Sequence, residues 1–448
     1  MAGVYVAQIP SAGTHPRSEV GKYLNVERPP LLRRKLVEIL FYLSVTLSAF
    51  SAAIGLPLPF AIGGIVTLSG AFTFGVWILS KDRLPISIWF AIAITALANL
   101  SQLLRGELPV FGVGLRSFLF WVSFLLMLCY LLQNQATQRR VLLFLSALVI
   151  VVVVLSGVQD PGYGRLRLEG AAGSFGNANA LAYTSGIFSV ALLFLSLRSS
   201  KKLRLILWAA AAVLFYDLFL TVSRGGLFAY ACGIAVLLIS VLSDRGVRIG
   251  GIVMIVAVAL GSFPGAYLLS DHITALGERV ELTSESKRLN VYSLSTLHDL
   301  KDTALVGRGR EMVDGVGSFP RPTEHNTFLY THMTYGGIAA WVYLAWLITL
   351  GIRILRMMRA HHLPFSIKLE VVAMFGMGLV AQFLSNQGQQ FVCTIYVTAL
   401  VERYTAPYGR RQIGARLAKQ REGERSNQEP LVGLPTGHDQ AGFHGSGW

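Results

Sequence analysis

The segment Glu324–Asn326 stands where a long apolar run begins, and its residue types could do chemistry. His325 can accept a proton when neutral, as a general base must. A helix that begins here would help to keep it neutral, because a helix N-terminus disfavours imidazolium. Asn326 could cap that helix. His332 would lie about 10.5 Å further along the helix axis, too far for one metal ion to bind both histidines.

His332 is therefore expected to be structural or to line a pocket. It lies about two turns deeper than His325 in the same apolar run. Tyr335 and the pair Gly336–Gly337 follow it, and we expect them to let a neighbouring helix or a lipid chain pack closely.

A second segment, RLRLEGAAGSFGNANA at 165–180, combines arginines with a Gly/Ser/Asn loop before an apolar run. The loop glycines allow close backbone approach, an asparagine could cap the following helix, and the free N–H groups of its first turn could bind an anion. Two interpretations stay open: a phosphate cradle, or a plain turn with a helix cap. The candidate residues are Arg165, Arg167, Gly176, Asn177 and Asn179.

Three further charged residues are candidates. Arg224 stands in SRGG, a very short connection between apolar runs; it could bind an anion or snorkel to the interface, and the glycines after it allow close approach. Asp217 would lie roughly 9 Å inside the membrane. It could pair with Arg224 or Arg288, or be a protonated or hydrogen-bonded structural residue. Arg288 lies on the amphipathic stretch 286–300, which could be a helix on the membrane surface.

Composition predicts that these residues belong to an all-α, polytopic membrane protein. Of 448 residues, 53% are hydrophobic and 14% charged, against roughly 25% charged in soluble proteins. Apolar runs of about 20 residues predict about twelve transmembrane helices. They lie near 37–55, 58–80, 85–104, 116–133, 140–158, 179–197, 205–222, 226–243, 249–269, 328–352, 369–386 and 389–404. The basic residues fall in short loops and tails, a pattern of membrane orientation that does not indicate a nucleic-acid partner.

The distribution of Lys and Arg places both termini in the cytoplasm. The candidate residues then fall at or near the outer face of the membrane. The predicted domains are a cytoplasmic segment at 1–36, nine spans at 37–269, a large outer loop at 270–327, three spans at 328–404, and a basic, largely disordered cytoplasmic tail at 405–448.

Arginines, a candidate base and an anion-binding helix start would thus meet at one membrane face. No carboxylate cluster with metal-ligand spacing accompanies them. Arginine binds phosphate oxygens bidentately and keeps its charge, so such a pocket suits a lipid-linked phosphate or diphosphate. His325 would deprotonate an attacking hydroxyl, and the arginines would stabilise the departing diphosphate in place of a metal. No cofactor is therefore expected.

Three segments resemble the signature segments of the bacterial O-antigen ligase and O-antigen polymerase superfamily. They are GSFGNANALA, LTVSRGGL and EHNTFLYTHMTYGGIAAW. The resemblance covers roughly 140–385 and includes about twelve spans with one large outer loop. It implies a metal-independent glycosyltransferase of the GT-C type in the bacterial inner membrane. Its active site would face the periplasm, and its donor would be a glycan linked to undecaprenyl diphosphate.

The resemblance also implies roles for single residues. His325 resembles the family's catalytic base. The family's diphosphate-contacting arginines correspond to Arg224, Arg288 and either Arg165 or Arg167. The chain departs from the family at Ala178, where family loops often have proline.

Two acceptors fit this resemblance. A ligase, the favoured interpretation, moves finished O-antigen onto lipid A–core during lipopolysaccharide biosynthesis. A polymerase, the alternative, moves the growing chain onto another lipid-linked repeat unit, and the Arg-x10-Gly spacing of Arg165 and Gly176 is associated with polymerases. A transporter or flippase of a lipid-linked glycan is less favoured, because it needs charged groups across the membrane midplane.

Overall fold

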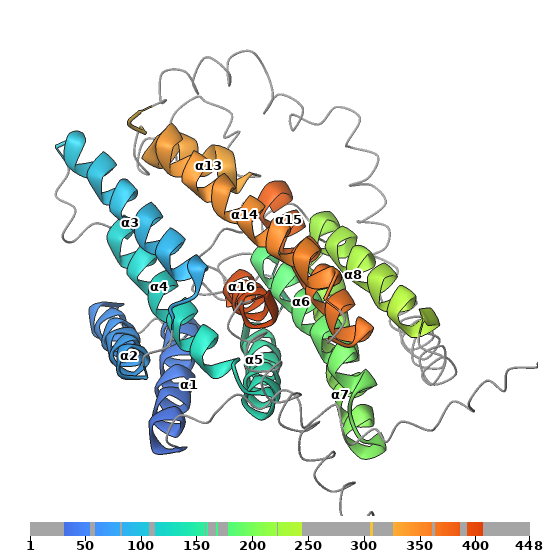
Figure 1. The fold of residues 1–448 in the computed structure, drawn as a ribbon. Helices are drawn as coiled ribbons and strands as arrows, with labels where there is room; N and C mark the ends of the chain where they lie inside the picture. The colour runs from blue at the N-terminus through green and yellow to red at the C-terminus, as the bar shows by residue number, and fades with distance from the viewer. Residues whose placement is uncertain are drawn as a thin grey trace, which may run out of the picture. The chain divides into compact units, whose positions relative to one another are not determined.

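A computed structural model describes much of the membrane-embedded part of the chain. The described residues are 31–53, 59–80, 83–106, 113–156, 158–159, 167–168, 178–221, 223–243, 305–307, 326–360, 363–385 and 392–405. All of them belong to one compact unit, Glu27–Ala406, drawn in Figure 1. The other unit, Met1–Val26 with Pro407–Trp448, lies outside the described residues, as does most of the predicted loop at 270–327. The predicted domain boundaries there stay predictions.

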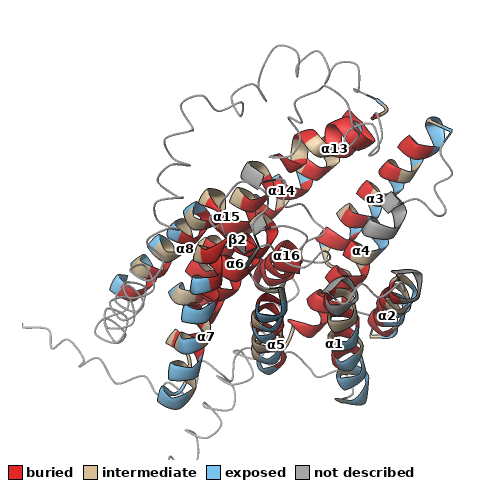
Figure 2. Cartoon of the chain, turned by 180° about the vertical axis from the view of Figure 1, so that it is seen from behind, coloured by how far each residue is buried: buried red, intermediate tan, exposed pale blue. Residues whose placement is uncertain are grey.

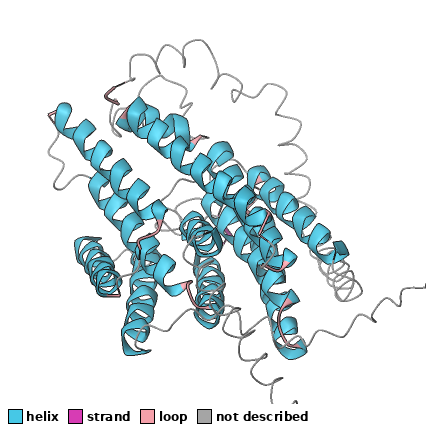
Figure 3. Ribbon diagram, viewed as in Figure 1, coloured by secondary structure: helices cyan, strands magenta, loops and turns pink. Residues whose placement is uncertain are grey.

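Helices dominate the described residues, and the predicted all-α class is confirmed (Figure 3). The helices are α1 (Leu31–Ala53), α2 (Pro59–Leu79), α3 (Ile86–Leu104), α4 (Val113–Leu131), α5 (Gln135–Ser156), α6 (Ala178–Leu197), α7 (Lys201–Leu220), α8 (Arg224–Ser243), α13 (Thr327–Tyr335), α14 (Gly337–Met358), α15 (Phe365–Ser385) and α16 (Val392–Thr405). Two short strands, β1 (Val158–Gln159) and β2 (Arg167–Leu168), form an antiparallel pair after α5.

Eight of the described helices are long and apolar enough to cross a membrane, as predicted for a multi-pass protein. They are α2, α3, α5, α6, α7, α8, α14 and α15. α16 has 14 residues, fewer than the roughly 20 that a crossing needs. α1 begins with charged residues, and α4 contains only a shorter apolar stretch, Leu119–Leu131. The predicted span at 249–269 lies outside the described residues, so the count of twelve stays a prediction.

The helix α6 is the centre of packing. It contacts α5, α7, α8, α15 and α16, and 94% of Asn179–Leu197 is buried, which Figure 2 shows in red. Small residues allow this packing: a Cβ added to Gly226 of α8 would lie 2.7 Å from the Cβ of Ala182. The prediction that a glycine after Arg224 lets a helix approach closely is therefore confirmed.

Three ion pairs join helices at one end of the bundle, which we call the ion-pair end. They are Arg140–Glu38 between α5 and α1, Arg198–Glu370 between α6 and α15, and Arg353–Glu402 between α14 and α16. A hydrogen bond from Arg403 to Gln138 connects the end of α16 to the start of α5. Charges buried in a membrane protein are costly unless paired, so these pairs select which helix ends meet.

Glu402 forms one hydrogen-bond network at the ion-pair end. It accepts hydrogen bonds from the backbone N–H of Ser87 at 2.8 Å, the Ser87 hydroxyl at 2.6 Å and Arg353 Nη1 at 2.8 Å. The Trp346 indole N–H donates to the same hydroxyl at 2.9 Å. This network fixes the start of α3 against α14 and α16.

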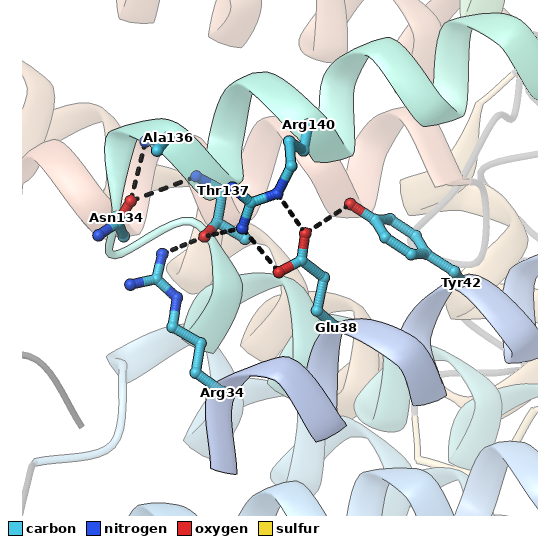
Figure 4. Close-up of polar contacts among 7 residues, drawn as sticks. All are labelled: Arg34, Glu38, Tyr42, Asn134, Ala136, Thr137 and Arg140. Atoms are coloured by element: carbon cyan, nitrogen blue, oxygen red, sulfur yellow. Dashed lines mark hydrogen bonds and ion pairs between the residues drawn. The ribbon is translucent and has the colours of Figure 1, made fainter. Parts of the chain in front are cut away.

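Glu38 forms a second network, shown in Figure 4. Arg140 donates to both carboxylate oxygens, at 2.6 and 2.8 Å, and the Tyr42 hydroxyl donates to one of them at 2.9 Å. Thr137 Oγ1 accepts from Arg34 and, at 3.3 Å, from Arg140. The network fixes α1 to the first turn of α5.

We predict that Glu370→Gln lowers the melting temperature of the purified protein more than Glu38→Gln does. Each substitution leaves one arginine without its carboxylate. The side chain of Arg198 is 14% exposed, whereas that of Arg140 is 56% exposed. Breaking a buried pair costs about 3–5 kcal/mol, and breaking an exposed one about 0–1 kcal/mol. Thermal unfolding in detergent measures the melting temperature of both variants, and equal decreases from the wild type would contradict this ranking.

Candidate functional site

The helix starts that carry the three sequence motifs lie at the end of the bundle opposite the ion-pair end. We call it the motif end. Asn179 and Arg198 are 19 positions apart on one helical path, about 28 Å at 1.5 Å per residue. α7 returns from the ion-pair end, so α8 begins at the motif end. Arg353, near the end of α14, lies at the ion-pair end, so Gly337 and the preceding α13 lie at the motif end.

A hydrogen bond joins two of the motifs there. The Ser223 hydroxyl, in SRGG, donates to Asn179 Oδ1, in GNANA, at 3.0 Å. The same hydroxyl accepts from the Gly226 N–H at 3.3 Å, so Ser223 also serves the start of α8. Ser223 is buried. Our sequence reasoning missed it, although serine immediately before a helix is a recognisable cap signal.

Asn179 does not cap α6, one of the two roles considered for it. It lies inside the helix, which begins at Ala178, and its side chain reaches across to α8 instead. The other candidate cap, Asn177, lies outside the described residues, as do Arg165 and Gly176. An anion cradle at this helix start therefore stays a prediction.

Arg224 is the first residue of α8 and is half-buried at the motif end. Asp217 lies on the neighbouring α7 and is 3% exposed. Its Oδ2 has no hydrogen-bond partner, and no ion pair joins it to Arg224 among the residues described. Pairing with Arg224, one of the possibilities considered for Asp217, is not seen among the described residues, and Arg288, the other candidate partner, lies outside them.

Asp217 lies near the motif end of its helix. It is three residues before Leu220, the last residue of α7, about 4.5 Å from the helix end. Its depth in the membrane stays a prediction. The strand β2, which carries Arg167, contacts this same helix. The fold thus brings the Arg167 backbone and the helix of Asp217 together.

The EHN segment leads into a short helix. Asn326 is the N-cap of α13, and its side-chain oxygen accepts from the N–H groups of Phe328 at 2.9 Å and Leu329 at 3.2 Å. The predicted cap is confirmed. His325 directly precedes Asn326 in the chain and lies outside the described residues. His332 and Tyr335 are buried on α13, 8% and 5% exposed.

The expected single span at 328–352 is instead two helices, α13 and α14. Gly336 separates them with φ 97°, a conformation that disfavours other residues. A Cβ added there would lie 2.3 Å from the carbonyl oxygen of Leu305. The neighbour expected to pack closely on this glycine pair was a helix or lipid. For Gly336 the close neighbour is instead the segment 305–307, which falls within the predicted loop at 270–327.

Gly307 and Arg105 complete this junction. A Cβ added to Gly307 would lie 2.2 Å from the carbonyl carbon of Thr334 on α13. Arg105 Nη1, at the end of α3, donates to the carbonyl oxygens of Gly307 at 2.8 Å and Thr334 at 3.2 Å. The 305–307 segment therefore holds the helix that begins with the EHN motif. Neither residue gave a signal in the sequence.

The described residues contain no group of three His, Cys, Asp or Glu side chains that could hold a metal ion. His325 and the long loop lie outside that search, so metal independence stays a prediction. No family model matches the chain, and neither curated proteins nor solved structures give a match. The resemblance to the ligase and polymerase superfamily therefore rests on the sequence motifs.

We predict that Gly307→Ala destabilises this junction, because the added Cβ meets backbone atoms of α13 that cannot yield as a side chain can. Overpacking of this kind costs about 1–3 kcal/mol. Gly376→Ala in α15 is the control: nothing lies within 4 Å of its added Cβ, so it should be neutral or slightly stabilising. Thermal unfolding compares the melting temperatures of the two variants. A decrease for Gly376→Ala as large as that for Gly307→Ala would refute the prediction.

Proposed function

We propose that the protein is a glycosyltransferase that moves a glycan from undecaprenyl diphosphate to an acceptor hydroxyl, with ligation of O-antigen to lipid A–core as the favoured reaction. In this proposal it works in the bacterial inner membrane, with both termini cytoplasmic and the motif end facing the periplasm. It uses no metal ion.

The hydrogen bond between Ser223 and Asn179 carries the proposal. Two segments that resemble signature motifs of one superfamily are 44 residues apart and contact each other directly. The third motif begins at the same end, where the Asn326 cap fixes the start of α13. Side chains drawn from three separate segments to one end of a membrane bundle are typical of a binding site.

In the proposed reaction, the acceptor hydroxyl attacks the anomeric carbon of the donor sugar, and His325 takes the hydroxyl proton. A bond from that carbon to the acceptor oxygen forms, the bond to the diphosphate oxygen breaks, and undecaprenyl diphosphate leaves with the electron pair. The developing charge on it is stabilised by arginines. These are Arg224, Arg288 and either Arg165 or Arg167.

The remaining candidate residues have supporting roles in this proposal. Asn326 and Asn179 position helix starts at the site, and His332 and Tyr335 line the wall of α13. Asp217 is a polar group buried near the site. The polymerase alternative differs only in its acceptor, and the Arg165–Gly176 spacing is the observation that favours it.

We predict that His325→Ala abolishes glycan transfer, because no other group in the proposal takes the acceptor proton. His361→Ala, the same substitution at a position between α14 and α15 in the sequence, is the control and should retain transfer. Cells that lack the wild-type copy are scored for O-antigen on lipopolysaccharide and for protein level in the membrane. Transfer by the His325 variant would refute its role as base.

We also predict that Ser223→Ala lowers transfer about fivefold to tenfold, in line with the roughly 1 kcal/mol of a lost hydrogen bond. Ser240→Ala, on the helix α8 that follows Ser223, is the control, because the Ser240 hydroxyl has no hydrogen-bond partner in the described part of the chain. The double variant Ser223→Ala, Asn179→Ala should transfer glycan only slightly more slowly than either single variant, because both substitutions remove the same hydrogen bond. Fully additive losses would show that the contact between the motifs does not matter to the site.

A further inference from the structure

Three arginines from three helices lie around one buried polar pair at the ion-pair end. Arg403 of α16 donates to Gln138 of α5, and its guanidinium carbon is 4.8 Å from the centre of the Tyr404 ring. The Tyr404 hydroxyl donates to the same Gln138 oxygen at 3.3 Å. Arg139, next to Gln138 on α5, lies close enough to Arg198 for the two positive charges to repel, and both arginines lie near Tyr404. We call Arg139, Arg198 and Arg403 the basic cluster.

The basic cluster has more positive charge and more donors than its neighbours satisfy. Within the part of the chain that the structure describes, only the Glu370 carboxylate forms an ion pair with it, through Arg198. Several guanidinium nitrogens are buried without a hydrogen-bond partner there: Arg139 Nε, Arg198 Nε, Arg198 Nη1 and Arg403 Nη2. Buried donors without acceptors are costly, and native proteins rarely leave several side by side.

The excess is local to this cluster. At the same end, Arg140 donates to both oxygens of Glu38, and Arg353 is paired with Glu402. Arg198 and Arg403 lie at the C-terminal ends of α6 and α16, where the helix dipole favours a cation. The helix dipole offsets part of the positive charge of these arginines, but it does not supply an acceptor for their unpartnered N–H groups.

We propose that the basic cluster binds a phosphate-bearing anion at the membrane interface. Guanidinium groups converging from separate helices match the several oxygens of a tetrahedral phosphate, and arginine binds such oxygens bidentately. The chemistry is shared by two sources, the headgroup of an anionic phospholipid and soluble phosphate. The site does not depend on the proposed transferase function, because about 28 Å along α6 separates Arg198 from Asn179.

The test measures the melting temperature of the purified full-length protein in phosphatidylcholine nanodiscs. One arm adds phosphatidylglycerol to the discs, and the other adds inorganic phosphate in place of chloride at equal ionic strength. We expect one arm or both to raise the melting temperature of the wild type. The phosphatidylglycerol arm alone identifies a lipid headgroup, and the phosphate arm alone identifies soluble phosphate.

The double variant Arg139→Gln, Arg403→Gln should lose the shift, with binding about tenfold weaker for each arginine removed. Arg356→Gln removes one charge from an exposed position at the same end, and this variant should keep the rise in melting temperature. Arg139→Lys, which keeps the charge but loses Nε, should bind more weakly than wild type, and it tests the site even if the double variant does not fold. Three results would overturn the proposal. The melting temperature of the wild type does not rise in either arm, the double variant keeps the full rise, or Arg139→Lys binds as tightly as the wild type.

Discussion

A charge buried in a membrane protein is costly unless it is paired, and ion pairs organise one end of the described structure. Glu38, Glu370 and Glu402 each meet an arginine from another helix, and the three pairs gather at one end. They connect α1 to α5, α6 to α15 and α14 to α16. Removing one member of a buried pair leaves an uncompensated buried charge, so Arg198–Glu370 and Arg353–Glu402 favour the helix neighbours that they join.

The opposite end is held by different interactions. Hydrogen bonds of neutral side chains and close glycine contacts bring the three motifs together there: Ser223 bonds Asn179, Asn326 caps α13, and Gly336 lies against the segment 305–307. No described carboxylate forms an ion pair at this end, since Asp217 has none. The described part of this end is thus held by hydrogen bonds and close packing, whereas the ion-pair end is held by ion pairs.

The sequence predicts what depends on local signals. Hydropathy predicts the helical membrane class, and an asparagine before an apolar run predicts the Asn326 cap. Contacts across the chain carry no such signal: Arg198 and Glu370 are 172 positions apart, and Arg105 and Thr334 are 229 apart. The break at Gly336 was missed because hydropathy continues through it. The open choice among the roles of Asp217 could not be made from the sequence, because it depends on which side chains the fold brings to α7. His325 and Arg288 lie outside the described residues, so their roles rest on motif resemblance alone.

The central claim is that this membrane protein transfers a glycan from a lipid diphosphate. The most direct measurement mixes the purified protein with labelled undecaprenyl-diphosphate-linked glycan and lipid A–core in detergent, with EDTA present. The account predicts labelled glycan on the acceptor and an equal amount of released undecaprenyl diphosphate. Unchanged donor and unlabelled acceptor after incubation with protein that is folded would contradict it.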